Sequence, residues 1–210
     1  MEKQKESRGV SFPVKKTLTW LAIFGGVGAL AMLFVYAPNG TAQSSKEAEP
    51  SKSVGASSEQ PKGLPDLKKL EGLEFFPDEG QEHVPEETRV IYKADPPTSG
   101  RHYAKWLPPG VYEENKTVPE LLVHNLEHGN VVVYMDRDRL SKDALESLQK
   151  LPTTYAGQWD GVVLVAKKGI SAPIILTAWR SKMSLKEYDS KKIEDFLDAF
   201  RGRGPENPIR

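Results

Sequence analysis

One uninterrupted apolar run, residues 17–37, constrains this chain more than any other feature of its sequence. The run reads TLTWLAIFGGVGALAMLFVYA and contains no charged residue. A helix needs about 20 such residues to cross the roughly 30 Å hydrocarbon core of a bilayer. The sequence therefore predicts one transmembrane helix over residues 17–37, which anchors the chain in a cell membrane.

Positive charges before this run predict its orientation. Residues 1–16 contain five lysine and arginine residues, and the first one after the run is Lys46. Because such residues accumulate on the cytoplasmic side, we expect residues 1–16 in the cytoplasm and the chain after residue 37 outside it. A cleaved signal peptide is the alternative, with GTA at residues 40–42 as its cleavage site. Its apolar region is usually about 7 to 15 residues long, so the length favours a retained signal-anchor.

The composition changes again after the apolar run. Residues 38–63 contain six serines and three prolines but no aromatic residue, which predicts a disordered linker. Residues 64–210 are then expected to form one extracytoplasmic domain. The formal net charge of the whole chain is zero, so no basic surface indicates a nucleic-acid partner. The chain has no cysteine, which excludes disulfides, a thiolate nucleophile and thiolate metal ligands.

The domain sequence alternates between strand and helix patterns. Short β-branched runs between turn residues predict strands, and apolar stripes that follow capping residues predict helices. The predicted strands span residues 88–93, 130–135, 162–167 and 174–179, and the predicted helices span residues 118–128, 141–151 and 190–202. This order predicts an α+β domain with a mixed sheet of about four strands and covering helices. The order is similar to the thioredoxin arrangement, without its redox cysteines.

Two of the four histidines of the chain lie on the first predicted helix, within HNLEH at residues 124–128. His124 and His128 are four residues apart, so a helix places both rings on one face, with Glu127 beside them. Thr117 and Glu120 are spaced like a capping box at its start, and Gly129 stands where a helix commonly ends. Two imidazoles on one rigid helix can bind a single metal ion, but they need further ligands.

The loop before this helix contains a third histidine. Residues 94–116 show neither helical nor strand periodicity, and a loop of such length in a compact domain is usually functional or disordered. Its aromatic side chains and proline pairs favour order. The turn Thr98-Ser99-Gly100 then presents His102, and His83 is the fourth and least constrained candidate. Nitrogen ligands without thiolate suit copper(II) or zinc, so we expect a transition metal held by His102, His124 and His128, with His83 or a water completing the shell.

Two other interpretations of the same residues remain open. The pattern H-x-x-E-H also occurs in zinc peptidases, where Glu127 would be the catalytic base that activates water. The later acids, Glu206 among them, have no evident ligand context in the sequence. Alternatively, the histidines only pack and hydrogen-bond. A purely structural cell-envelope protein of this kind would bind no metal and would expose an apolar patch.

Four segments together resemble a known bacterial family. They read DPPTSGRHY, PPGVY, LVHNLEHGNVVVYM and LTAW, and they follow an N-terminal membrane span. In this order they resemble the family catalogued as domain of unknown function 3105, over roughly residues 70–205. The resemblance implies a membrane-anchored extracytoplasmic domain whose signature includes His102, Glu127, His128 and Gly129. Arg101 stands where the family often has proline, and the family name implies no activity.

Overall fold

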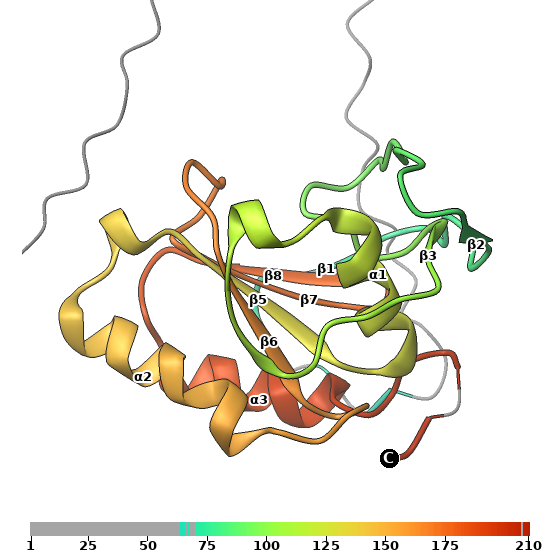
Figure 1. Ribbon diagram of the computed structural model, residues 1–210. Coiled ribbons are helices and arrows are strands. Elements are labelled where there is room, and N and C mark those ends of the chain that lie inside the picture. Colours follow the sequence, from blue (N-terminus) through green and yellow to red (C-terminus); the bar gives the residue numbers. More distant parts are fainter. Residues whose placement is uncertain (1–63, 66, 68–69, 207) are drawn as a thin grey trace, which may run out of the picture. The chain divides into compact units, whose positions relative to one another are not determined.

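The computed structural model describes residues 64–210 except 66, 68–69 and 207, and Figure 1 shows their arrangement. The predicted cytoplasmic segment, membrane span and linker all fall in residues 1–63, outside the described part. Within the described part, no helix combines the length and the apolar character that crossing a membrane requires.

A mixed sheet of six strands forms the centre of the described domain, in the order β1-β8-β7-β5-β6-β4. Strands β4, β5 and β6 are parallel, and β7, β8 and β1 join through antiparallel pairs. The six strands are β1 (Leu73–Phe75), β4 (Gly110–Glu113), β5 (Val131–Met135), β6 (Val162–Ala166), β7 (Ile174–Ala178) and β8 (Ser181–Leu185). A separate parallel pair is formed by β2 (His83–Val84) and β3 (His102–Tyr103).

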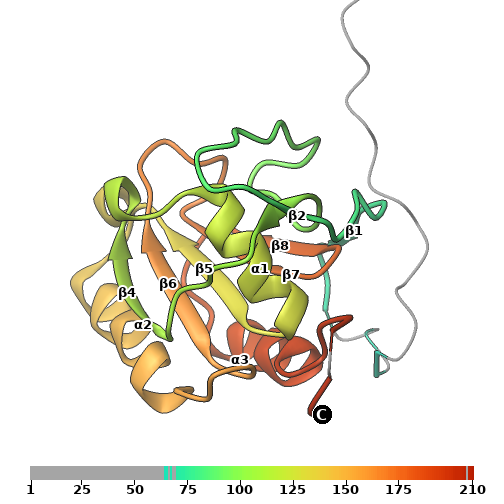
Figure 2. The ribbon, with the colours of Figure 1, turned by 45° about the vertical axis from the view of Figure 1, so that its right-hand side comes forward.

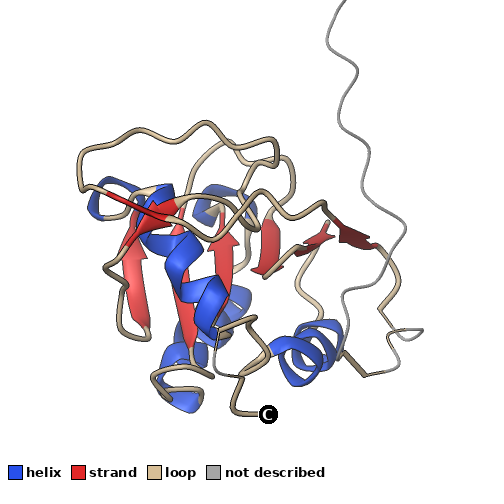
Figure 3. Cartoon of the chain, turned by 90° about the vertical axis from the view of Figure 1, so that its right-hand side faces the viewer, coloured by secondary structure: helices blue, strands red, loops and turns tan. Residues whose placement is uncertain are grey.

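Three α-helices cover this sheet from both sides (Figures 1 and 3). Helix α1 (Pro119–His128) packs on one face, and α2 (Lys142–Thr154) and α3 (Ser190–Phe200) pack on the other. Figure 2 shows α2 and α3 together below the strands. Because α2 connects the parallel strands β5 and β6, it forms the crossover that such a pair requires.

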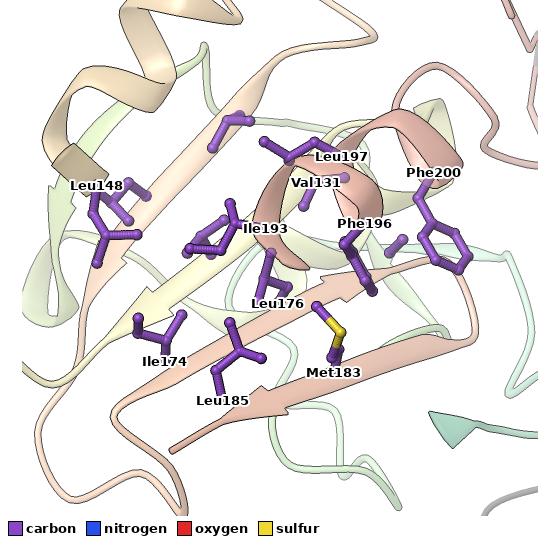
Figure 4. Close-up of a cluster of buried hydrophobic side chains, with 14 of the residues drawn as sticks. Val131, Leu148, Ile174, Leu176, Met183, Leu185, Ile193, Phe196, Leu197 and Phe200 are labelled. Carbon is purple, nitrogen blue, oxygen red and sulfur yellow. The ribbon is translucent and has the colours of Figure 1, made fainter. Parts of the chain in front are cut away.

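Both faces of the central strands are buried, which explains their sequence. In β5, Val131, Val133 and Met135 enter the core under α2 and α3. Val132 and Tyr134 face the core under α1. Figure 4 shows Ile193, Phe196 and Leu197 of α3 over the first of these cores. Every residue of β5 is buried, so the strand has a continuous apolar run in place of alternation.

The structure confirms the α+β class and the mixed sheet, but the sheet has six strands where the sequence predicted about four. The helix prediction was close at all three positions. Strands at 130–135, 162–167 and 174–179 correspond to β5, β6 and β7, each to within one residue. Ser141 caps α2 by accepting from the Ala144 amide, whereas Asp189 in place of Ser190 caps α3. The likeness to thioredoxin stays a prediction.

The predicted strand at residues 88–93 was wrong. The residues of this segment alternate between half-buried and exposed positions, as in a strand. Its backbone amides, however, form hydrogen bonds to side chains of distant residues and not to a neighbouring strand. The Val90 amide donates to the Glu120 carboxylate at 2.9 Å, and the Lys93 amide donates to the Glu79 carboxylate at 3.0 Å. Ile91 is 96% exposed, so this apolar side chain does not belong to a buried face of a sheet.

Three strands of the main sheet had no recognised signal in the sequence. Strand β4 lies inside the predicted loop at 94–116 and is an edge strand that pairs only with β6. Its residues are half-buried or exposed, so its four residues lack an apolar run. Strand β8 alternates buried and half-buried positions but contains two serines and a lysine. Strand β1 has only three residues, all half-buried.

Candidate metal centre

Helix α1 presents the central residues of the site near its C-terminus. Pro119 occupies its first turn, and Gly129 ends it with a φ of 104°, a left-handed conformation that glycine adopts without strain. The expected capping box does not form, because Val118 is the N-cap and has no side-chain cap bond. Glu120 is buried and accepts instead from the Val90 amide. This bond ties the start of α1 to the segment that precedes the loop.

Two separate segments bring a histidine to α1. Strands β2 and β3 pair in parallel with His83 directly opposite His102, and β3 packs against α1 (Figure 1). The pairing places both histidines beside His124 and Glu127 of the helix. Each of these four residues has a ligand atom within 4.8 Å of the others. We name His83, His102, His124 and Glu127 the histidine cluster.

The rings of the cluster meet face to edge and face to face. The ring centres of His102 and His124 are 5.1 Å apart at an interplanar angle of 88°. His83 stacks on His124 at 5.1 Å and lies edge-on to His102 at 5.0 Å. His102 is fully buried and His124 is nearly so, whereas the His83 side chain is 48% exposed. His83 therefore forms the solvent-facing side of the cluster.

Backbone carbonyls orient the two buried rings. Nδ1 of His102 donates to the Gly100 carbonyl at 2.8 Å, and Nδ1 of His124 donates to the Tyr103 carbonyl at 2.8 Å. A carbonyl only accepts, so both Nδ1 atoms carry hydrogen and both Nε2 atoms point into the cluster. Metal-binding histidines are commonly held in this way by a carbonyl on the second nitrogen.

The turn before His102 needs its glycine. Gly100 has a φ of 124°, and a Cβ there would lie 2.9 Å from the Tyr92 ring. Its amide donates to the Gly80 carbonyl at 3.0 Å, and the next ladder bond runs from the His102 amide to the Glu82 carbonyl at 3.1 Å. The expected turn at residues 98–100 is thus fixed on both sides, and it delivers His102 in one orientation.

His102 and Glu127 form a buried ion pair. Nε2 of His102 lies 2.9 Å from Oε2 of Glu127. Burial lowers the pKa of His102, but the hydrogen bonds to Glu127 and Gly100 outweigh it, so the net pKa is raised. For Glu127, burial raises the pKa, but the hydrogen bond from His102 outweighs it and the net pKa is lowered. Both shifts favour an imidazolium beside a carboxylate.

His124 is electrostatically different from His102. Burial lowers its pKa to about 4, and the neighbouring histidines add to this effect. Its Nδ1 donates to the Tyr103 carbonyl, so Nε2 of the neutral ring carries a lone pair and no hydrogen. This atom accepts from Nε2 of His128 at 2.9 Å. A neutral imidazole whose second ring nitrogen carries a lone pair is the form that ligates a metal ion.

The structure places His128 beside the cluster, in contact with its His124 member. The His128 ring stacks on Trp159 at 3.9 Å and an angle of 24°, and Nε2 lies 3.7 Å from Oε2 of Glu206. Trp106 stacks on His124 at 5.7 Å and lies 5.0 Å from Trp159. The two tryptophans form an aromatic wall along the helix face that carries both histidines.

All four predicted ligands therefore gather at one end of α1, but the grouping differs from the expected one. The histidine cluster contains Glu127, which the sequence suggested only as a catalytic base, and His128 forms a second group with Glu127 and Glu206. Glu206 has no ligand context in the amino-acid sequence, because it lies 78 positions after His128. Only the return of the chain to α1 brings it close. Which of these residues bind metal stays a prediction.

Comparison with known proteins gives one match. The profile of the family described as "Protein of unknown function (DUF3105)" matches residues 83–209 of the chain, which is more than half of it. The match begins at His83 and includes the whole histidine cluster and Glu206. Neither a curated protein nor a solved structure matches the chain.

Proposed function

Because the chain belongs to this DUF3105 family, whose description assigns no activity, we propose its function from the site: the domain binds a transition metal ion at the histidine cluster. The proposal includes the location expected from the sequence, outside the membrane and anchored by residues 17–37. The observation that carries it is the convergence of three imidazoles and one buried carboxylate within 4.8 Å.

The ligand set supports copper(II) or zinc. Three imidazole nitrogens and one carboxylate oxygen suit either ion, and neither needs a thiolate. In a tetrahedral zinc site the ligand atoms lie about 3.3 Å apart, given bonds of about 2.0 Å. Nε2 of His83 is 4.0 Å from Oε2 of Glu127, so His83 must move inward by roughly 0.7 Å to reach that separation. Its half-exposed side chain on a two-residue strand permits this movement.

The protein supplies a prepared site for the ion. His124 is neutral, and His102 and Glu127 face one another with a proton between them. An ion at the cluster takes the place of that proton, and the carbonyls of Gly100 and Tyr103 hold the rings as they are. The exposed His83 provides the route from solvent. If the cluster served only packing, the half-exposed His83 would not need a ligand atom within 4.8 Å of those of the other three residues.

Metal-dependent stability tests the proposal. The full-length chain, purified in detergent and stripped with a chelator, is heated with and without zinc or copper(II) at pH 7.5. An ion that binds only the folded state at 100 times its dissociation constant adds about 2.7 kcal/mol. For a domain of this size, such a gain raises the melting temperature by roughly 5 to 10 °C.

Variants separate ligand binding from packing. His83→Gln is the sharpest, because the side chain is half exposed and its loss leaves the metal-free fold intact. It should reduce the stabilisation by metal, whereas the neighbouring Glu82→Gln should not, since Glu82 makes only a surface pair with Arg101 at 3.6 Å. If neither ion raises the melting temperature of the unaltered chain, the proposal is wrong.

A zinc peptidase is the second candidate, and the position of Glu206 is the observation that favours it. In that case His124 and His128 bind the ion, Glu206 supplies the carboxylate ligand, and Glu127 takes a proton from water. The contact between Glu127 and His102 argues against it, because the proposed base already has a proton donor at 2.9 Å. Zinc-dependent cleavage of casein peptides that Glu127→Gln abolishes would favour this candidate.

A further inference from the structure

A second group of metal-ligating side chains adjoins the histidine cluster. Glu127, His128 and Glu206 each have a ligand atom within 4.8 Å of the others, and we name them the glutamate cluster. Glu127 belongs to both clusters. Its carboxylate has two oxygens, and Oε2 is the atom that contacts His102. One carboxylate thus lies between two sets of ligands.

The backbone holds Glu206 firmly at the end of α1. The Glu206 amide donates to the Glu127 carbonyl at 3.2 Å, and the Gly202 amide donates to the Gly129 carbonyl at 2.8 Å. A Cβ on Gly204 would lie 2.0 Å from the Glu127 carbonyl oxygen. Only glycine permits so close an approach. These contacts place the Glu206 side chain beside His128, although 78 positions separate the two residues.

The glutamate cluster brings two carboxylates together. Glu127 and Glu206 each offer a carboxylate oxygen within 4.8 Å of the other. Two adjacent carboxylates repel one another unless a proton or a cation lies between them. Within the described residues, the only ion-pair partner of Glu206 is His128, at 3.7 Å. A divalent cation would compensate both carboxylates at once.

Filling the histidine cluster makes His128 available. In the present structure Nε2 of His128 donates to Nε2 of His124 at 2.9 Å. An ion at the histidine cluster uses that lone pair of His124, so His128 loses its acceptor. Its Nε2 then has Glu206 as its nearest described alternative partner. Stacking on Trp159 keeps the ring at this position, beside both carboxylates.

We propose that Glu127, His128 and Glu206 bind a second divalent cation, with Glu127 as the carboxylate that bridges it to the ion of the histidine cluster. The inference rests on the proposed function, because the bridge needs the first ion. Ions that share a carboxylate typically lie about 3.5 to 4 Å apart. One nitrogen and two carboxylate oxygens suit zinc and harder first-row cations such as manganese(II).

The number of bound zinc ions tests the inference. The metal-free full-length chain is dialysed against zinc at pH 7.5, and bound metal per chain is measured by elemental analysis. We expect two zinc ions in the unaltered chain and one in Glu206→Ala, which removes a ligand of the second ion only. Glu206 is exposed and keeps its backbone bond to Glu127, so the substitution leaves the fold intact. Glu187→Ala, at an exposed acid in a loop, is the matched control and should retain two.

Each other outcome has a definite meaning. One zinc ion in the unaltered chain, lost in His83→Gln, overturns the second site and leaves the proposed function standing. Two ions in both the unaltered chain and Glu206→Ala place the second ion elsewhere and also overturn the inference. No bound zinc or copper in the unaltered chain contradicts the proposed function, and the second site with it.

Discussion

At the scale of single residues, Glu127 has the most unusual position in this domain. It is a carboxylate with 3% exposure on a helix that faces a sheet, where an unpaired charge would be costly. His102 compensates it at 2.9 Å, and His83 and Glu206 lie next to the pair. Glu120 is equally buried on the same helix, but its partner is the Val90 amide. The two glutamates therefore allow the proposed ligand role of Glu127 to be compared with the structural role of Glu120.

Glu127→Gln should weaken zinc or copper binding by at least about 100-fold, since it removes a charged ligand. The metal-free protein should lose roughly 1 to 3 kcal/mol, because His102 keeps its hydrogen bond but loses the charge partner. Glu120→Gln is the control, with a comparable loss of stability and an unchanged metal affinity. Calorimetric titration and urea unfolding measure both quantities. Equal metal affinity in the two variants would show that Glu127 only packs.

The folding stability of the metal-free protein should depend on pH through the histidine cluster. The raised pKa of His102 stabilises the fold below its ordinary value of 6.5, and this contribution is lost as pH rises through the folded pKa. The lowered pKa of His124, about 4, has the opposite effect on stability. Below pH 6.5 the unfolded chain binds a proton at His124 while the folded chain does not, so stability falls as the pH falls. The contribution of the two histidines to stability should therefore be greatest near pH 6.5.

His124→Gln should remove the acid side of this dependence. Between pH 6.5 and 4 the unaltered protein should lose up to about 3 kcal/mol through His124 alone, given about 1.4 kcal/mol for each unit of pKa. The lowered pKa of Glu127 adds a further loss below its ordinary value of 4.5. The free energy of unfolding in urea, measured at pH 7.5, 6.5 and 5, gives the comparison. An identical slope for both proteins below pH 6.5 would mean that His124 is not held neutral.

At the scale of elements, the end of α1 is joined to the C-terminal segment at one glycine. Gly129 has a positive φ, and a Cβ there would lie 2.8 Å from the Arg203 amide nitrogen and 2.9 Å from Gly202. This close contact positions the segment that carries Glu206. The sequence indicated that Gly129 ends the helix, and the structure confirms it. It also shows a second reason for glycine, which is the return of a distant segment.

Gly129→Ala should destabilise the protein more than its backbone conformation alone explains. The left-handed conformation costs alanine roughly 1 kcal/mol, and the contact with the C-terminal backbone adds roughly 1 to 3 kcal/mol. Gly169→Ala is the matched control, since Gly169 has a φ of 72° but nothing within 4 Å of its Cβ. Thermal unfolding of the two variants should differ by this contact term. Equal losses would show that the segment moves aside without cost.

For the whole molecule, the proposed extracytoplasmic location determines which metal ions are available to the domain. The described residues form the domain that carries the site, and the predicted span at residues 17–37 lies outside them. An extracytoplasmic domain with no cysteine contains no thiolate to bind copper(I) or to be oxidised. The proposed histidine and carboxylate ligands would be insensitive to an oxidising compartment.

A protease added outside intact cells should test this topology. It should remove an epitope tag at the C-terminus and leave a tag at the N-terminus protected, because residues 1–16 are expected in the cytoplasm. Immunoblots of both tags, before and after permeabilising the cells, provide the measurement and its control. A protected C-terminal tag would overturn the orientation. Release into the medium of a domain that keeps the C-terminal tag but lacks the N-terminal tag would indicate a cleaved signal peptide.

Elements whose pattern is local could be predicted from the amino-acid sequence. The apolar runs of β5, β6 and β7 are buried on both faces, so each was recognisable without its neighbours. Helix α1 was predicted from a capping box at its start and from Gly129 at its end, and of these two signals only the glycine is confirmed. The pair His124 and His128 followed from helical periodicity, and His102 from the turn that precedes it. Family membership also followed from short segments in a fixed order.

Contacts between residues that are distant along the chain could be identified only from the folded structure. Residues 88–93 contain a short β-branched run that is typical of a strand, but their amides donate to carboxylates from elsewhere in the chain. No local sequence pattern reveals those partners. Strand pairing put His83 opposite His102, and the returning C-terminus put Glu206 beside His128. The role of Glu127 changed for the same reason, because its neighbours come from three segments. Periodicity predicts which residues share a face, whereas contact between faces depends on how the elements pack.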